Sequence, residues 1–225
     1  MRRIVLWSIA FTLIGAAAAA VAAPPEPKTE EQKVLYALGL AMSQSVSVFS
    51  LSEAELEMVQ SGLYDGVLSK TKKVDVQVYG PKIQELHTAR TGAVAAVEKK
   101  AGQSFIDKAA AEKGATKTPS GLVITSLKAG TGASPKATDK VKVHYHGTLT
   151  DGTVFDSSVQ RKEPATFPLN GVIPCWTEGV QLMKVGGKSR LVCPPALAYG
   201  DRGAPPRIKP GSTLVFEVEL LEIVK

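Results

Sequence analysis

One short stretch of the chain constrains its fold more than any other. Residues 143–158 read VHYHGTLTDGTVFDSS, with two runs rich in Val, Thr and aromatic residues on either side of Asp151-Gly152. Asp-Gly pairs favour tight turns between paired strands, so the stretch predicts a hairpin that returns Phe155 and Asp156 close to Tyr145. Three kinds of site are compatible with it: a metal site, an acid–base site, or an apolar pocket with a polar group at its rim.

The metal and acid–base interpretations have little support in the sequence. His144 and His146 would share one face of a strand, but a metal site needs a third ligand, and Asp156 is the nearest candidate. We therefore predict no metal site. Asp151 belongs to the turn for backbone reasons, which leaves Asp156 without a partner carboxylate. The favoured interpretation is an apolar pocket with aromatic walls, in which Asp156 is the polar group that orients the ligand.

The C-terminal half is predicted to be an α+β domain over residues 115–225. Runs rich in Val, Leu and Thr predict strands, and one short helix is expected at about residues 176–183. An antiparallel sheet wrapped on one short helix satisfies this pattern. The predicted strands cover residues 122–127, 141–149, 188–192 and 213–224.

The first 22 residues are predicted to be a signal peptide. Arg2 and Arg3 precede an apolar run from Ile4 to Val21, and small residues lead to a cleavage site such as Ala20-Val21-Ala22. The alternative is a membrane anchor, because the run approaches the roughly 20 residues that span a bilayer. Removing these residues lowers the net charge from +6 to +4. The remaining basic residues are spread along the chain, which argues against nucleic-acid binding.

Residues 23–114 are predicted to be helical. Capping boxes start at Thr29 and at Ser52, and each is followed by an apolar stripe at helical spacing. Two short amphipathic helices cannot bury both stripes in one small monomer, so they need a partner surface.

A third, longer helix is predicted from about Pro81 to Lys113, with Gly114 ending it. Its apolar residues are too sparse for a buried helix, so a connecting spacer arm is expected. The alternative is two shorter helices that meet near Gly92. His87 is predicted to be a surface residue without a function.

The chain contains two cysteines, Cys175 and Cys193. In an oxidising compartment such a pair favours a disulfide. The alternative is two small buried apolar residues. The 17 intervening residues exclude a C-x-x-C redox motif.

Four motifs follow one another in the C-terminal half: residues 144–158, Gly171–Trp176, Leu197–Gly200 and Thr213–Leu220. In this order they resemble the FKBP-type peptidyl-prolyl cis-trans isomerases, and the resemblance covers about residues 119–225. The helical residues 28–114 resemble the N-terminal dimerisation domain of the exported two-domain members, the FkpA and macrophage infectivity potentiator (Mip) type. This resemblance implies a homodimer formed through residues 28–70, located in the periplasm or at the outer membrane.

The resemblance also implies a pocket for the proline ring. Its floor would be Trp176, and the backbone N–H of Ile173 would hold a substrate carbonyl. The apolar residues that would form its walls, edge and flap are Tyr145, Phe155, Phe216, Val172, Ile173 and Ile208.

The same resemblance implies catalytic roles for two further residues and for Tyr145. Asp156 would lie beside the reacting carbonyl, held by Arg161 and Tyr145. Tyr199 would donate its hydroxyl to the substrate backbone. The catalytic set is therefore Asp156, Tyr199 and Tyr145.

The activity implied is isomerisation of proline-containing, unfolded or exported polypeptides, without a cofactor. Macrolides of the tacrolimus and rapamycin type are the implied inhibitors. The sequence departs from the family pattern at Ala165, Ala204, Arg207 and Cys175. The alternative is a non-catalytic holdase, a periplasmic chaperone dimer that binds unfolded clients.

Overall fold

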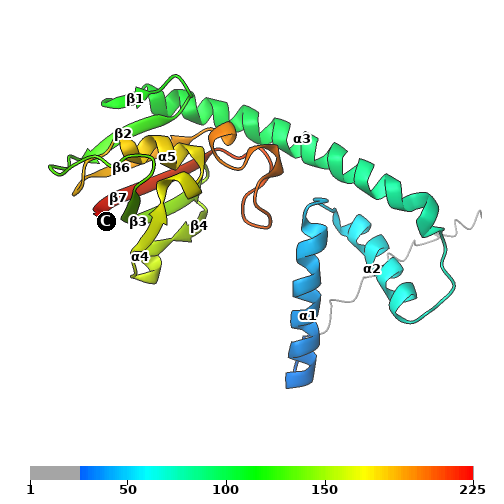
Figure 1. Cartoon of the computed structure of the whole chain (residues 1–225). Helices are drawn as coiled ribbons and strands as arrows, with labels where there is room; N and C mark the ends of the chain where they lie inside the picture. Colours follow the sequence, from blue (N-terminus) through cyan, green and yellow to red (C-terminus); the bar gives the residue numbers. More distant parts are fainter. Residues whose placement is uncertain (1–25, 225) are drawn as a thin grey trace, which may run out of the picture. The chain divides into compact units, whose positions relative to one another are not determined.

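The computed structural model describes residues 26–224, so the predicted signal peptide lies outside the described residues. Its C-terminal part is an antiparallel sheet with strand order β1-β2-β6-β7-β3-β4, and β5 pairs with β3 (Figure 1). The α+β fold predicted from the sequence is confirmed. The strands are β1 (Ala115–Lys117), β2 (Val123–Lys128), β3 (Lys140–Leu149), β4 (Val154–Ser157), β5 (Ala165–Pro168), β6 (Lys188–Cys193) and β7 (Leu214–Val224).

The predicted hairpin is formed by β3 and β4. Gly152 has a φ of 88°, and Asp151 Oδ1 accepts a hydrogen bond of 2.8 Å from the Thr153 N–H. The left-handed backbone favours glycine, and the Asp side chain closes the turn locally. Beyond the turn, the register shifts by one residue between Gly147 and Thr148, and this shift pairs Gly147 with Asp156. Alternation along β3 then directs Tyr145 into the core.

One helix, α5 (Pro174–Gln181), covers the inner face of the sheet. It begins two residues before the prediction, because Pro174 suits the first helical turn, where its missing N–H costs no hydrogen bond. Cys175 of α5 and Cys193 of β6 are joined in a disulfide, with their Cα atoms 5.7 Å apart. Short segments complete the domain, among them α4 (Ser158–Arg161).

Two N-terminal helices, α1 (Glu30–Ser47) and α2 (Glu53–Val67), start at the predicted caps. The Gln32 N–H donates to Thr29 Oγ1 at 3.2 Å, and the Thr29 N–H donates to Gln32 Oε1 at 3.1 Å. The Ser52 N–H donates to Glu55 Oε2 at 2.9 Å. Neither helix contains a buried residue.

Helix α3 (Val76–Ala110) begins before Pro81, so the predicted start was wrong. Asp75 caps it by accepting a hydrogen bond of 2.8 Å from the Gln77 N–H, a stronger signal than the proline. The helix passes through Gly92 without a break, which excludes two shorter helices. His87 is also less exposed than predicted, because its ring packs edge-on against Phe49 at 5.6 Å.

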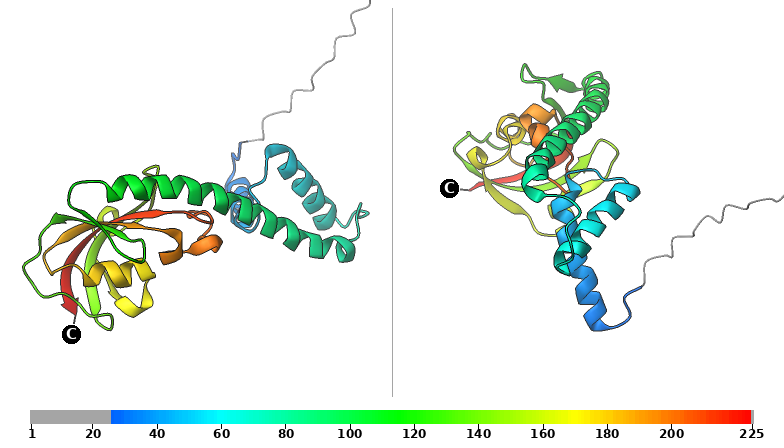
Figure 2. Two further views of the ribbon diagram at one scale, coloured as in Figure 1. Left: turned by 90° about the horizontal axis from the view of Figure 1, so that it is seen from above. Right: turned by 90° about the vertical axis from the view of Figure 1, so that its right-hand side faces the viewer.

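The C-terminal half of α3 lies against the sheet domain, as Figure 2 shows. The expectation that α3 is too poor in apolar residues to be buried was therefore wrong for this half. Small residues allow the approach: a Cβ at Gly102 would overlap the hydroxyl of Thr213, and Ala95 is 3% exposed. Helix α3 and the sheet belong to one compact unit that begins at Ala41. Within residues 26–224, no helix combines the length and apolarity needed to cross a membrane.

Candidate active site

The centre of the site is a cluster of aromatic rings around Trp176. The first turn of α5 places the indole edge-on to Tyr145 of β3, with ring centroids 5.2 Å apart, and to Phe216 of β7 at 5.4 Å. Phe155 of β4 meets Phe216 edge-on at 5.5 Å. Edge-to-face packing is a favourable arrangement for aromatic rings. The structure therefore brings together the four aromatic residues that the sequence assigned to the pocket floor and walls.

Two further residues belong to this cluster but were not assigned to the site. The ring of Phe167 in β5 lies 5.8 Å from Trp176 and 6.0 Å from Tyr145. A Cβ added at Gly147 would come within 2.7 Å of the Phe155 ring and 3.0 Å of Phe216. A glycine inside a strand often marks such a close approach, so the sequence did contain a signal for Gly147.

A polar group of three residues, Asp156, Tyr145 and Arg161, borders the aromatic cluster. The Tyr145 hydroxyl donates to Asp156 Oδ2, and Arg161 Nη1 donates to Asp156 Oδ1. Arg161 Nη2 donates to the Tyr145 hydroxyl oxygen at 2.9 Å. The three side chains thus hold one another, as the resemblance implied for them.

These contacts set the charges at the rim. Burial acts to raise the pKa of Asp156, but hydrogen bonds from Tyr145 and Arg161 outweigh it and hold that pKa below its usual value. Burial, together with the hydrogen bond to Asp156, raises the pKa of Tyr145. At neutral pH the rim therefore presents a carboxylate, a neutral phenol and a guanidinium.

Val172 and Ile173, which the resemblance places at the edge of the pocket, lie just before α5. Both side chains are partly buried against the core. Ile173 is the N-cap residue of α5, and Pro174 follows it in the first turn. The helix start therefore fixes the backbone of Ile173 beside the ring cluster.

The loop Tyr199–Gly211, called the flap below, carries the remaining predicted site residues. Ile208 is 5% exposed and joins the core, whereas Tyr199 is 41% exposed. Arg207 Nη1 donates to the Phe155 carbonyl oxygen at 2.9 Å. Arg207, a departure from the family pattern, therefore ties the flap to β4. A cavity of about 630 Å³ lies there, lined by Asp156 and Arg207 among other residues.

The two strand histidines make contacts outside the ring cluster. His144 Nδ1 lies 3.1 Å from Ser158 Oγ, and His146 Nδ1 lies 3.0 Å from Ser157 Oγ. Each histidine is therefore engaged with a serine that follows β4 or ends it. Across residues 26–224, no group of three or more His, Cys, Asp or Glu side chains is arranged to hold a metal ion.

Known proteins resemble this chain along most of its length. Residues 132–221 match the family model of the FKBP-type peptidyl-prolyl cis-trans isomerases, and residues 31–124 match that of the domain amino terminal to such isomerases. FkpA from Aeromonas hydrophila, an FKBP-type peptidyl-prolyl cis-trans isomerase, is 47% identical over 202 residues, which cover 84% of this chain and 75% of that protein. The FKBP-type 22 kDa isomerase of Escherichia coli strain K12 is 46% identical over 193 residues, covering 84% of this chain and 93% of that protein.

A solved structure agrees with these relatives. The crystal structure of FkpA from Escherichia coli superposes with a TM-score of 0.66 at 39% sequence identity, covering 87% of this chain and 97% of that chain. The match includes both the helices and the sheet domain. The chain belongs to the family of FKBP-type peptidyl-prolyl cis-trans isomerases and is a peptidyl-prolyl isomerase.

Proposed function

We propose that the aromatic cluster binds the X-Pro segment of a polypeptide client and that catalysis takes place against its surface. Trp176 forms the floor for the proline ring, and Tyr145, Phe155 and Phe216 form the walls. Val172, Ile173 and Ile208 complete the edge. The observation that carries this proposal is the ring cluster around Trp176, bordered by the hydrogen-bonded group of Asp156, Tyr145 and Arg161.

The reaction needs a change of environment for the amide rather than a nucleophile. Rotation about the X-Pro bond has a barrier of about 18–20 kcal/mol, because resonance gives the C–N bond double-bond character. The twisted amide has lost that resonance and is less polar than the planar amide. An apolar aromatic pocket therefore binds the twisted form better than the planar form, which lowers the barrier.

The polar residues orient the substrate in this proposal. The Asp156 carboxylate lies by the reacting carbonyl and acts through its charge, since the lowered pKa makes it a poor proton donor. The Tyr199 hydroxyl donates to the substrate backbone, and its partial exposure leaves it accessible to a client. The Ile173 N–H holds a substrate carbonyl.

The N-terminal helices indicate how the chain assembles. We infer a homodimer through residues 28–70, because α1 and α2 expose apolar side chains such as Leu35 and Leu63, which are 59% and 46% exposed. Dimerisation would bury these faces. We further propose export to the periplasm or the outer membrane, proline-containing unfolded polypeptides as clients, and inhibition by macrolides of the tacrolimus and rapamycin type.

A holdase without catalysis is the other function considered. The similarity to FKBP-type isomerases does not favour it over the isomerase. The two functions separate by mutation. Catalysis depends on Trp176 and Tyr199, whereas client holding would survive their loss and depend on residues 28–114.

The test is a protease-free prolyl isomerisation assay on the chain without residues 1–22, with and without tacrolimus. Trp176 is the only tryptophan after residue 22, so its fluorescence reports ligand binding in the same sample. We expect tacrolimus-sensitive activity that Trp176→Ala removes. Leu182→Ala, a change of an exposed residue just after α5, is the matched control and retains activity. A folded wild-type protein without activity would refute the proposed site.

A further inference from the structure

The flap is a loop closed by hydrogen bonds of its own backbone. Its base is closed by the Gly211 N–H, which donates to the Gly200 carbonyl at 2.9 Å. Gly200, Gly203 and Gly211 all have positive φ, with values of 56°, 63° and 75°. Such positions favour glycine, and glycine leaves the chain conformationally permissive. Tyr199 is 41% exposed, so the place of the flap as a whole, and of Tyr199 with it, depends on what the flap contacts outside itself.

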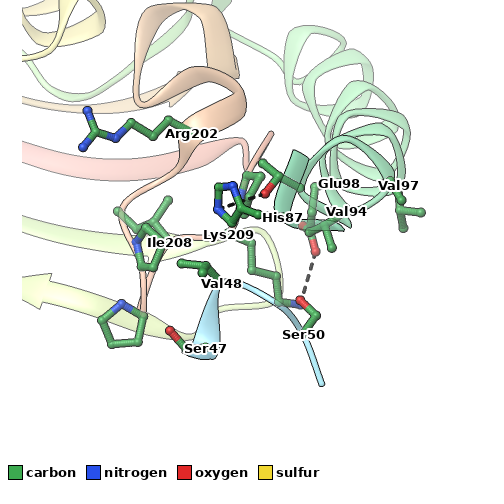
Figure 3. A pocket seen from close by; sticks show the side chains of 15 residues that line it. Ser47, Val48, Ser50, His87, Val94, Val97, Glu98, Arg202, Ile208 and Lys209 are labelled. Carbon is green, nitrogen blue, oxygen red and sulfur yellow. Dashed lines mark hydrogen bonds and ion pairs between the residues drawn. The ribbon is translucent and has the colours of Figure 1, made fainter. Parts of the chain in front are cut away.

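Both ends of the flap contact helix α3. Near its start, the Asp201 carboxylate forms an ion pair with Lys99 of α3 at 2.5 Å. Near its end, Lys209 forms an ion pair with Glu98 of α3 at 3.2 Å (Figure 3). The two charges are neighbours on one helix and have opposite signs, so each one selects a different end of the loop.

The backbones also meet at this place. A Cβ added at Gly211 would come within 2.6 Å of the Ala95 carbonyl oxygen, so the end of the flap lies directly on α3. The middle of the flap is different, because a cavity of about 990 Å³ lies beside it, lined by Val94 and Val97 of α3 and by Ile208 (Figure 3). Side chains of α3 therefore do not pack tightly over the middle of the flap. Besides the approach of Gly211 to Ala95, the two ion pairs connect the flap to α3, one on each side of the loop.

The opposite side of the flap reaches the rim of the candidate active site. Arg207 donates to the Phe155 carbonyl, one residue before Asp156. Within the flap, the Ile208 N–H donates to the Ala204 carbonyl at 3.0 Å, and the Ala204 N–H donates to the Ile208 carbonyl at 2.8 Å. A shift of the flap on α3 would therefore move Ile208 and Arg207 together relative to Phe155 and Asp156.

We propose that α3 is a positioning element of the isomerase site, in which Glu98 and Lys99 hold the flap so that Tyr199 and Ile208 face the bound substrate. This inference deepens the proposed function and rests on it. It assigns to the connecting helix a part in substrate binding, beyond linking the helices to the sheet domain. Glu98 and Lys99 are positioning residues, since they act through the flap and do not themselves touch the substrate.

Charge reversal followed by charge exchange tests the proposal. Lys99→Glu and Glu98→Lys each place like charges opposite the flap. Because exposed ion pairs contribute modestly, we expect kcat/KM for a proline-containing peptide to fall about two- to fivefold, through a higher KM with kcat nearly unchanged. The exchanged doubles, Lys99→Glu with Asp201→Lys and Glu98→Lys with Lys209→Glu, are expected to restore KM.

The matched control is a third ion pair that ties α3 to the sheet domain away from the flap. Glu112, just after α3, contacts Arg190 of β6 at 2.8 Å. Glu112→Lys is expected to leave KM and kcat as in the wild type. If this control raises KM as much as Lys99→Glu does, helix docking in general is responsible, and the proposed role of Glu98 and Lys99 is refuted.

A second measurement does not depend on activity. Hydrogen exchange at the Ala204, Ile208 and Gly211 amides reports how firmly the flap is held. We expect faster exchange in Lys99→Glu and Glu98→Lys and recovery in the exchanged doubles. Unchanged exchange in the reversals would overturn this inference even if the isomerase is active. A wild type without isomerase activity but with this exchange pattern would refute the proposed function and leave the α3–flap coupling supported.

Discussion

The N-terminal helices and the sheet domain differ in how far their apolar side chains are buried within the chain. In α1 and α2 no residue is buried, and Val34 and Leu35 are 66% and 59% exposed. In the sheet domain, Leu122, Val143 and Leu191 are each 0% exposed. The sheet domain thus forms its own core, whereas α1 and α2 display apolar faces that residues 26–224 leave exposed.

This difference explains what each region contributes. A core built from one chain can hold Trp176 and its neighbouring rings in fixed positions, as a binding pocket requires. A pair of short helices is only marginally stable alone, because most helical stability in proteins comes from packing of the apolar face. We therefore expect changes in α1 to alter assembly and changes in the sheet domain to alter stability and catalysis.

The largest expected effect is on assembly. Leu35→Glu combined with Leu38→Glu places two charges on the apolar face of α1, and we expect a monomer in analytical ultracentrifugation. Isomerase activity on a short peptide should stay within about twofold, because the pocket is not touched. Leu127→Glu, at an exposed apolar position of β2, is the control and stays dimeric. A double variant that remains a dimer would contradict an interface through residues 28–70.

The next effect concerns the disulfide of the sheet domain. Cys175 and Cys193 are 18 positions apart and fully buried. Replacing both by Ala should lower the free energy of unfolding by about 3 kcal/mol, because a loop of this length is no longer closed in the unfolded chain. Urea unfolding of the two proteins measures the difference. Non-reducing mass spectrometry should find the native chain two hydrogens lighter than the reduced chain, and two free thiols in the native chain would exclude the bridge.

Replacing glycine by alanine should have opposite effects on stability at Gly147 and at Gly92. Gly147→Ala should destabilise the protein by about 1–3 kcal/mol, because the new methyl group meets the rings of Phe155 and Phe216. Gly92→Ala should stabilise it by up to about 1 kcal/mol, because Gly92 lies in the middle of α3 with open space around it. Urea unfolding measures both. A loss of stability in both variants would show that α3 is packed at Gly92 as well.

Removing the rim carboxylate should have a moderate effect on catalysis. Asp156→Asn is expected to lower kcat/KM about tenfold, equivalent to about 1.4 kcal/mol, since the aromatic pocket remains. Because the pKa of Asp156 is lowered, its carboxylate is present above the usual value of 3.8 and is lost only as pH falls through the lower folded value. Wild-type activity should therefore stay level from pH 8 to pH 5. Asp151→Asn, in the turn, is the control.

A wild-type rate that falls with an apparent pKa near 6 would contradict this assignment for Asp156. So would complete loss of activity in Asp156→Asn together with a sharp acidic pH dependence. Either result would indicate proton transfer by this carboxyl.

The smallest expected effect is on the pH dependence of stability, at the ion pair between Glu55 of α2 and Arg90 of α3. Hydrogen bonds from Arg90, and then from the Ser52 backbone, lower the pKa of Glu55 to about 2. Its contribution to stability is therefore complete above its usual pKa of 4.5 and is lost as pH falls toward 2. Glu55→Gln should remove this pH dependence, measured by circular dichroism between pH 5 and pH 2. Glu57→Gln in the same helix is the control, and equal curves for both variants would contradict the role of Glu55.

The sequence predicted the hairpin from a local signal, whereas the proposed pocket residues came from the resemblance of four motifs to a known family. Asp151-Gly152 determines the turn, but a register shift between Gly147 and Thr148, which the turn signal does not predict, places Asp156 opposite Gly147. The caps at Thr29 and Ser52 were equally local. By contrast, Phe167 was not assigned to the site, because its place beside Trp176 depends on β5 pairing with β3.

The sequence by itself determined the fold class, the two kinds of region, and the family to which the sheet domain belongs. Turn, cap and strand patterns act over a few residues, so they can be read directly. Only the tertiary structure decided that α3 lies on the sheet domain and contacts both ends of the flap. That docking depends on small residues such as Ala95 and Gly102, which carry no apolar stripe, and on partners more than a hundred positions away, such as Asp201 and Lys209. Their effect arises from close approach between surfaces, which no pattern along the chain encodes.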